Sequence, residues 1–265
     1  EQFGMHPVYA HEWEILGSGG GIRGLIRAHG DVEGTLVVLN GDSVMDVDLT
    51  PHIEAHKASG RAVTLLTRPK AEDQPGKVFV DGDGTLHGIR DYRRPNAPGS
   101  LIEHDFTGVH IVEMSALMEL PLDHFDIIDT LYGRMLEDDG AIGISEVDGF
   151  WAALDSPKLM LETAAAVLRE PSRFKLAPLP EPHTDGLWFY NAAGVDDKAE
   201  FAPPVFLGLN TVVEPGAKIG PNVVADGVTI KAGTEVSNCV LYGMGELEGE
   251  WRDLVGVAGQ IAPIS

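Results

Sequence analysis

Short apolar runs bounded by glycine, proline and acidic residues predict alternating strands and helices in the first 170 residues. Residues 35–40 (TLVVLN) and 62–67 (AVTLLT) have the length and aliphatic content of buried strands. The segment between them begins with Thr50 and Pro51 and stops before Gly60, which is typical of a capped helix. A strand, a helix and a strand in this order predict a βαβ unit with a parallel sheet, and therefore an α/β fold.

Similar punctuation predicts the elements that follow. Two alternating runs over residues 77–90 flank Asp81-Gly82-Asp83-Gly84, which predicts a β-hairpin turn. Residues 106–112 (FTGVHIV) predict another strand, and helices are expected to begin at Asp126 and at Ser156. Residues 171–204 are rich in Pro, Asp and Gly and carry no strong period. We therefore expect a first domain over residues 1–170 and a linker over 171–204.

The tail, residues 205–265, has a six-residue period. Aliphatic residues begin the units, a small or aliphatic residue follows four positions later, and turn-forming residues lie between: Val213 and Ala217, Ile219 and Val223, Ile230 and Thr234, Val236 and Val240. This hexapeptide pattern predicts a short left-handed parallel β-helix, in which each rung covers the apolar face of its neighbour. A two-sheet sandwich is the alternative.

Charge and cysteine content restrict the function. The 265 residues include 41 Asp and Glu but only 19 Lys and Arg, a net charge of −22, which argues against nucleic-acid and anionic membrane surfaces as partners. One cysteine, Cys239, excludes an internal disulfide framework. No apolar run approaches the roughly 18 residues needed to span a bilayer. A reducing, cytoplasmic setting is expected.

Two segments carry candidate chemistry. Gly19, Gly21 and Gly24 satisfy G-x-G-x-x-G, but the polar residues before them do not form the strand that a dinucleotide site requires. Glycines before a helix still suit close approach to a base or a phosphate, with a flexible turn as the alternative. Asp42 follows a predicted strand and could hold Mg²⁺, or it could simply cap a turn.

Arginines gather after the predicted hairpin. Arg90, Arg93 and Arg94 form a local positive cluster in an acidic chain. Because a guanidinium matches the geometry of phosphate oxygens, they predict a phosphate contact. A solvated strand end is the alternative.

The order of these motifs resembles that of the sugar-1-phosphate nucleotidyltransferases, and most of all the mannose-1-phosphate guanylyltransferase and heptose-phosphate branches. The likeness runs through LGSGGGIRG, VVLNGDSVMDVDL, AVTLLTRP, VFVDGDGTLHGIRDYRRP, FTGVHIV and GFWAALDSPKLMLETA, and covers residues 8–168 and the tail. It implies a Rossmann-like (GT-A-like) domain that uses Mg²⁺. The implied reaction transfers a nucleoside monophosphate from a nucleoside triphosphate to a sugar 1-phosphate and releases pyrophosphate.

The resemblance also implies roles for individual residues. Asp42 matches the catalytic, magnesium-binding Asp, and Arg94 stands where the family has a Lys beside the phosphates. Arg93 replaces a Glu that contacts the sugar. The remaining matches are glycine-rich positions and their neighbours: Gly17, Ser18, Gly19, Gly20, Gly21, Asn40 and Gly41 in the nucleotide site, and Gly76 and Gly108 in the sugar site.

Three departures from the family pattern affect the expected activity. The family's opening strand and G-x-G-x-R loop are absent, so we expect a domain that lacks its first βα unit and a chain that is weakly active or inactive as written. Ala153 stands where a second magnesium-binding Asp is usual, and Asp155 is the candidate replacement. Arg93 inverts a charge at the sugar site.

These departures leave a second function open. Ala153 and Arg93 favour a non-catalytic regulatory or assembly subunit that binds a nucleotide sugar. A hexapeptide acyltransferase would need a catalytic His among the rungs, and residues 205–265 contain none. The open end of the predicted β-helix suggests homo-oligomers.

Overall fold

The computed structural model describes residues 7–30, 33–70, 77–118, 120–175, 181–190 and 194–264. Its internal contacts divide the chain into two compact units. The first comprises residues 1–41 and 48–148, and the second comprises residues 42–47 and 149–265. The short segment 42–47 therefore belongs to the second unit, although it lies within the predicted first domain.

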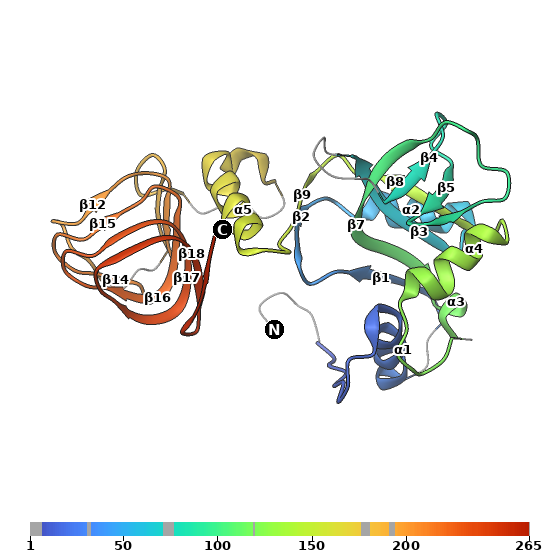
Figure 1. The fold of residues 1–265 in the computed structure, drawn as a ribbon, viewed down its shortest axis with the longest axis horizontal. Coiled ribbons are helices and arrows are strands. Elements are labelled where there is room, and N and C mark those ends of the chain that lie inside the picture. Colours follow the sequence, from blue (N-terminus) through green and yellow to red (C-terminus); the bar gives the residue numbers. More distant parts are fainter. Residues whose placement is uncertain are drawn as a thin grey trace. The chain divides into compact units, whose positions relative to one another are not determined.

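The first unit is built on a seven-stranded mixed sheet (Figure 1). The strand order is β6-β5-β4-β7-β3-β8, and β1 also pairs with β7. The pair β3 and β8 is parallel, whereas the other pairs are antiparallel. The strands are β1 (Thr35–Leu39), β3 (Val63–Pro69), β4 (Val78–Val80), β5 (Leu86–Ile89), β6 (Tyr92–Arg93), β7 (Ile102–Glu113) and β8 (Ile142–Glu146).

The two strands of the predicted βαβ unit are not neighbours. β1 and β3 are both antiparallel to β7, which lies between them. They therefore run in the same direction, as predicted, but the sheet is mixed rather than parallel. The inserted strand comes from residues 102–113, and a local pattern around residues 35–67 carries no information about it.

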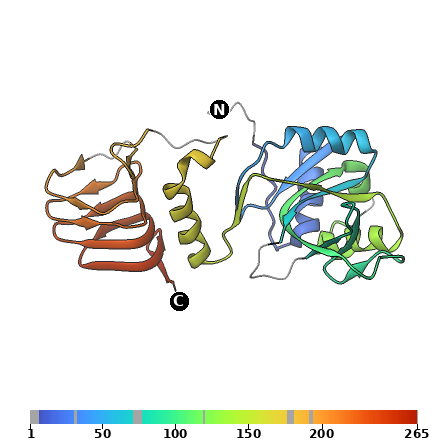
Figure 2. The same ribbon diagram turned by 90° about the horizontal axis from the view of Figure 1, so that it is seen from above.

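Helices flank this sheet. Figure 2 shows α2 (Thr50–Ser59) on one side, with α1 (Gly17–His29) and α4 (Gly133–Glu137) on the other. Short helical segments α3 (Met114–Met118) and η1 (a π-helix, Ile128–Tyr132) complete the second layer. The core lies between that layer and the sheet, and its buried members include Ile26, Leu65, Leu86, Val112, Leu117, Tyr132 and Leu136.

Local signals in this unit are confirmed. Helix α2 ends at Gly60, whose φ of 66° is the left-handed conformation of a C-terminal cap. The turn between β4 and β5 is closed by the Asp81 carboxylate, which accepts hydrogen bonds from the N–H groups of Asp83 and Thr85 at 3.0 and 2.9 Å. The predicted hairpin is therefore present, and Asp81 has a structural role in it.

The second unit starts with a two-stranded antiparallel ribbon. β2 (Ser43–Asp46) pairs with β9 (Phe150–Ala153), and Ser43 lies opposite Ala153. Helix α5 (Pro157–Arg169) follows, and the Oγ of Ser156 accepts a hydrogen bond from the N–H of Leu159 as the predicted N-cap. A 3₁₀ turn, η2 (Pro171–Arg173), ends this part of the chain.

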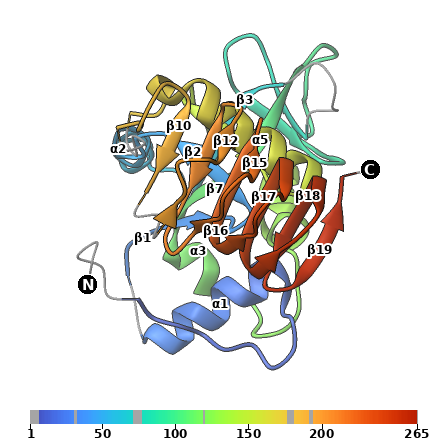
Figure 3. The same ribbon diagram turned by 90° about the vertical axis from the view of Figure 1, so that its left-hand side faces the viewer.

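The rest of the second unit is mainly a parallel β-helix, which confirms the β-helix predicted for the tail, and its last two strands pair antiparallel. Its inward side chains stack in columns, such as Leu187, Val205, Val223, Cys239 and Leu254. Figure 3 shows β12, β15, β17 and β18 side by side along one face. The strands are β10 (Leu187–Phe189), β11 (Gly194–Val195), β12 (Glu200–Phe201), β13 (Val205–Leu207), β14 (Val212–Val213), β15 (Lys218–Ile219), β16 (Val223–Ile230), β17 (Glu235–Leu247), β18 (Glu250–Val257) and β19 (Gln260–Pro263).

The coil begins earlier than the sequence pattern suggests. β10, β11 and β12 pair in parallel with β13, β14 and β15, so part of the predicted linker forms the first rung. In this rung Gly and Pro do not recur at the fixed positions that they hold in the later repeats, so the six-residue period is not visible in the sequence. Cys239 is fully buried in the coil, consistent with a packing role. None of the helices in the described part of the chain is long and apolar enough to cross a membrane.

Candidate functional site

The glycine-rich segment forms the first turns of α1. A Cβ on Gly19 would lie 2.0 Å from a ring carbon of Phe125, and one on Gly20 would lie 2.3 Å from the carbonyl oxygen of Asp123. Gly17 has a φ of 73° and faces the carbonyl of Phe125. These glycines therefore let the helix lie directly on residues 123–125. Contact between Gly17–Gly21 and a nucleotide base stays a prediction.

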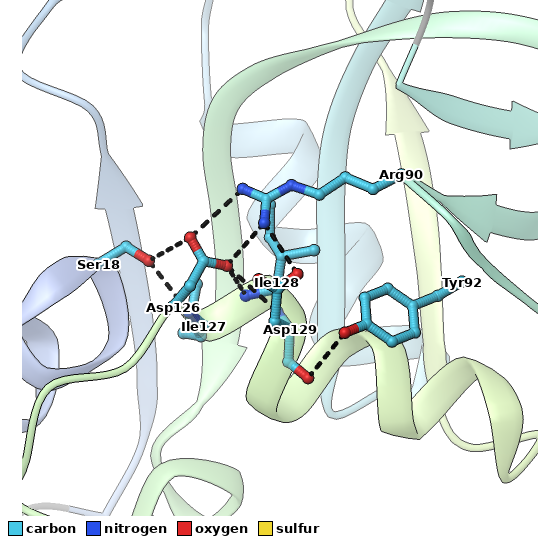
Figure 4. Close-up of polar contacts among 7 residues, drawn as sticks. All are labelled: Ser18, Arg90, Tyr92, Asp126, Ile127, Ile128 and Asp129. Carbon is cyan, nitrogen blue, oxygen red and sulfur yellow. Dashed lines mark hydrogen bonds and ion pairs between the residues drawn. The ribbon is translucent and has the colours of Figure 1, made fainter.

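Ser18 connects the start of α1 to the start of η1 (Figure 4). Its hydroxyl donates to Oδ2 of Asp126 at 3.3 Å and accepts from the N–H of Ile127 at 3.0 Å. Oδ1 of Asp126 accepts from the N–H groups of Ile128 and Asp129 at 2.9 and 3.2 Å. Asp126 therefore caps the helical segment that follows it, as the sequence predicts.

Arg90 completes this network from the hairpin between β5 and β6. Its Nη1 lies 3.0 Å from Oδ1 of Asp126 and 2.9 Å from Oδ1 of Asp129, and its Nη2 donates to Oδ2 of Asp126 at 3.3 Å (Figure 4). Partial burial disfavours the charged Asp126 carboxyl, but the guanidinium and the N–H donors outweigh burial, so its pKa lies below the usual value. Burial likewise opposes the charge on Arg90, and the two carboxylates raise its pKa in spite of it.

Asn40 and Gly108 meet at the end of β1. The N–H of Asn40 donates to the carbonyl oxygen of Gly108 at 3.2 Å. A Cβ on Gly108 would lie 2.7 Å from Nδ2 of Asn40, so the carboxamide occupies the space that a larger residue would fill. Gly41 follows and is exposed. The structure thus brings together residues that the sequence assigned separately to nucleotide and sugar, while Gly76 lies outside the described residues.

Arg93 is engaged in the hairpin. Its guanidinium carbon lies 3.8 Å from the centre of the Phe79 ring, and Nη1 donates to the carbonyl oxygens of Arg90 and Tyr92. Gly88 leaves room for it, because a Cβ there would lie 2.7 Å from Cδ of Arg93. A sugar contact by Arg93 stays a prediction.

Arg94 is held by four acceptors. Nε donates to the carbonyl oxygen of Leu86 at 2.8 Å, Nη2 donates to those of Ile142 and Gly140 at 3.0 and 3.2 Å, and Nη1 pairs with Asp139. Its guanidinium therefore ties β5 to the loop before β8. A phosphate contact by Arg94 would require some of these acceptors to be exchanged.

The two candidate metal ligands lie just outside neighbouring strand ends of the second unit, Asp42 before β2 and Asp155 after β9. Ser43 of β2 pairs with Ala153 of β9, and the N–H of Leu154 donates to the carbonyl oxygen of Asp42 at 2.7 Å. Asp42 and Asp155 therefore flank one point of the ribbon, and both are exposed. Mg²⁺ is usually held by one or two carboxylates together with substrate phosphates and water, so this donor set fits it. Within the described ranges, no three potential ligands come together.

The structure divides the predicted site residues between the two units. Asp42 and Asp155 belong to the second unit, and the other described candidates belong to the first. Sequence reasoning treated Arg90 as part of a positive cluster and Asp126 as a helix cap. It missed that they pair, because 36 residues separate them and only their opposite charges hinted at a contact.

Comparison with known proteins gives relatives along most of the chain. The UTP–glucose-1-phosphate uridylyltransferase of Synechocystis is 24% identical over 91% of this chain and 66% of its own length. The mannose-1-phosphate guanylyltransferase of Mycobacterium tuberculosis is 26% identical over 90% of this chain and 63% of its own length. The chain spans about two thirds of the length of these relatives, and no protein-family model matches it.

Solved structures of similar proteins include HddC from Yersinia pseudotuberculosis complexed with GMP-PN. It is 19% identical, with a TM-score of 0.44 over 57% of this chain and 62% of that chain. The similarity in sequence, and not the structural comparison, identifies the relatives of this chain. It confirms the resemblance found in the sequence: this chain is a relative of the sugar-1-phosphate nucleotidyltransferases.

Proposed function

We propose that this chain acts in transfer of a nucleoside monophosphate from a nucleoside triphosphate to a sugar 1-phosphate. The relatives that align over nine tenths of the chain carry names of this activity. The structural observation that supports it most is the pairing of β2 with β9, which sets Asp42 beside the Leu154–Asp155 strand end. We further propose a cytoplasmic setting and self-association through the β-helix.

In the proposed reaction, an oxygen of the sugar 1-phosphate attacks the α-phosphorus of the triphosphate. A new P–O bond forms, the bond from the α-phosphorus to the bridging oxygen breaks, and pyrophosphate leaves with its electron pair. Such a transfer depends on positioning and on stabilisation of phosphate charge. A bound Mg²⁺ would neutralise part of that charge. Asp42 and Asp155 would hold the ion through their carboxylates.

Other residues would bind the two substrates. The start of α1, with Asn40 and Gly41, would contact the nucleotide, and Gly108 with Gly76 and Arg93 would line the sugar. Gly108 is buried and has no Cβ that would displace Asn40, so the two proposed subsites can lie side by side. Arg94 would reach the phosphates only by exchanging acceptors, so its replacement should lower stability together with activity.

One observation favours a second candidate, a regulatory subunit that binds a nucleotide sugar without turnover. Ala153, opposite Ser43 on the ribbon, supplies no carboxylate where the family pattern has an Asp. The two candidates differ in their need for a metal. Nucleotidyl transfer requires Mg²⁺ at Asp42, whereas a sensor would bind the nucleotide sugar equally well without it.

Thermal-shift titration of the whole chain tests the proposal. GTP and UTP, and the matching nucleotide sugars, are added with and without Mg²⁺, because a ligand that binds only the folded state raises the Tm by mass action. We expect a Mg²⁺-dependent shift with a nucleoside triphosphate, followed by pyrophosphate release at a low rate when mannose or glucose 1-phosphate is added.

The matched variants are Asp42→Asn and Asp197→Asn, the second an exposed aspartate elsewhere in the same unit. Asp42→Asn should remove the Mg²⁺ dependence, and Asp197→Asn should keep it. A shift with nucleotide sugar alone, indifferent to Mg²⁺, would favour the regulatory candidate. The absence of any shift with every ligand would contradict both.

A further inference from the structure

Arg90 projects from a rigid turn. It lies between β5 and β6 with a φ of 50°, and its N–H donates to the carbonyl oxygen of Lys77 at 2.7 Å. The Arg93 guanidinium donates to the carbonyl oxygen of Arg90 from the same hairpin. Tyr92, two residues on, packs against Gly133 of α4. The backbone that carries the Arg90 side chain is therefore fixed on several sides.

The partner of Arg90 is the segment that supports the start of α1. The N–H of Gly19 donates to the carbonyl oxygen of Phe125, and the N–H of Phe125 donates to that of Leu16, both at 3.0 Å. The Ser18 hydroxyl adds its bonds to Asp126 and Ile127. The position of residues 16–19 therefore depends on where residues 125–127 lie.

Arg90 holds that segment through charge. Asp126 and Asp129 are two carboxylates at the start of one short helix, and Arg90 pairs with both (Figure 4). Without the guanidinium, the two like charges would repel each other. Asp126 would then be free to turn away from Ser18. Its hydrogen bond with the Ser18 hydroxyl is 3.3 Å long, and none of its other hydrogen bonds is longer.

We propose that Arg90 is a positioning residue for nucleotide binding, which acts through Asp126 and Ser18 to fix the glycine-rich start of α1. This inference rests on the proposed function, because it assigns that segment to the nucleotide. In this role Arg90 acts through its contacts with Asp126 and Asp129 and not through contact with substrate. Its role is to keep the Ser18 hydroxyl and the Gly19 N–H in one arrangement before the nucleotide arrives, which reduces the ordering cost of binding.

The first experiment needs no ligand. Hydrogen exchange is followed at the amides of Gly19 and Ile127 in the whole chain, in wild type, Arg90→Gln and Arg90→Lys. We expect exchange at both amides to be at least about 5-fold faster in Arg90→Gln. Arg90→Lys should restore part of the protection, because it keeps the charge but not the fork that spans two carboxylates.

Arg68→Gln is the matched control. Arg68 pairs with Asp105 at 3.4 Å in the same unit, and its side chain is 29% exposed against 37% for Arg90. The control should leave exchange at Gly19 and Ile127 unchanged. Equal acceleration in both variants would mean that any lost ion pair loosens the unit, and it would overturn the inference.

The second experiment measures coupling in nucleotide binding. Dissociation constants for GTP and UTP with Mg²⁺ are compared in Arg90→Gln, Ser18→Ala and the double variant. Arg90 and Ser18 do not contact each other, so independent effects on the dissociation constant would multiply in the double variant. If both act through Asp126, the double variant should bind nucleotide no more weakly than the weaker-binding single variant. We expect each single change to raise the dissociation constant about 5-fold or more.

The outcomes separate this inference from the proposed function. Unchanged exchange at Gly19 in Arg90→Gln, or fully multiplicative effects on the dissociation constant, would overturn the inference even though nucleotide binds. If wild type binds no nucleotide, the proposed function fails and the role of Arg90 in nucleotide binding fails with it. Faster exchange would then show only that Arg90 orders the helix start.

Discussion

The Nδ2 atom of Asn40 lies only 2.7 Å from the position that a Cβ of Gly108 would take. Gly108 has a φ of 77° within β7, and the N–H of Asn40 donates to its carbonyl oxygen. Both the backbone conformation and the close approach require glycine at position 108. Gly108, a candidate for the sugar site, and Asn40, a candidate for the nucleotide site, are thus in direct contact, and a change at one should affect the other.

Gly108→Ala should lower stability more than an ordinary glycine replacement at positive φ. Gly84 is the matched control, because its φ of 78° is nearly that of Gly108 and no atom lies within 4 Å of its hypothetical Cβ. We expect about 1–2 kcal/mol for Gly84→Ala from backbone strain alone. A further cost of about 1–3 kcal/mol is expected for Gly108→Ala, since Asn40 must move. Urea unfolding of the two variants measures the difference, and equal losses would contradict it.

Two glycines of α1 should respond in opposite directions to the same change. Gly19→Ala places a methyl group 2.0 Å from the Phe125 ring, so the helix must move away from residues 123–125. Gly24→Ala meets only Leu16 Cδ1 at 3.9 Å and should stabilise the helix by up to about 1 kcal/mol through helix propensity. Melting temperatures of both variants test this, and a harmless Gly19→Ala would show that the close packing on Phe125 is unimportant.

Elements with local chemistry could be predicted from the sequence. The Ser156 cap, the Gly60 helix end and the Asp81 turn depend on residues within a few positions of each other. The β-helix is also readable, because its repeated contacts impose a period on the chain. These features lie where short-range sequence and final structure agree.

Features that join distant segments could not be predicted in the same way. β7 lies between β1 and β3 although it comes later in the chain. Arg90 pairs with Asp126, which is 36 residues away in the sequence. The predicted strand end indicates Asp42 as a metal ligand and the family resemblance indicates Asp155, but neither shows that β2 pairs with β9. Tertiary pairing decides these positions, and a local pattern carries no information about the partner.

A row of hydrogen-bonded side chains along one corner of the β-helix should stabilise the fold, and Asn238 should contribute through both its side chain and its backbone conformation. Nδ2 of Asn222 donates to Oδ1 of Asn238 at 2.8 Å, and Nδ2 of Asn238 donates to Asp253 at 3.1 Å. Asn238 has a φ of 48°, which alanine adopts only with strain. Asn238→Gly should therefore cost about 1 kcal/mol for the lost hydrogen bonds, and Asn238→Ala about 1–2 kcal/mol more. Urea unfolding of the two variants separates the contribution of the hydrogen bonds from that of backbone strain. An Asn238→Ala variant no less stable than Asn238→Gly would refute the strain argument.

His110 should make the first unit less stable as the pH falls. Burial lowers the pKa of its imidazole to about 4, and Nδ1 contacts the hydroxyl of Tyr132, whose own pKa burial raises. Because the folded pKa lies below the unfolded value of about 6.5, the unfolded chain binds more protons between these values. Stability from this residue is therefore complete above pH 6.5 and is lost as the pH falls toward 4, by up to about 1.4 kcal/mol per pH unit.

His110→Gln isolates this contribution, because glutamine can keep a hydrogen bond to Tyr132 and does not titrate. The T-shaped contact of the imidazole with Phe106 is lost at every pH, so the variant should be less stable than wild type at pH 7.5. The gap in unfolding free energy should then shrink, and can reverse in sign, as urea unfolding is repeated down to pH 4.5. A gap that stays constant with pH would mean that His110 is protonated in the folded state as readily as in the unfolded one.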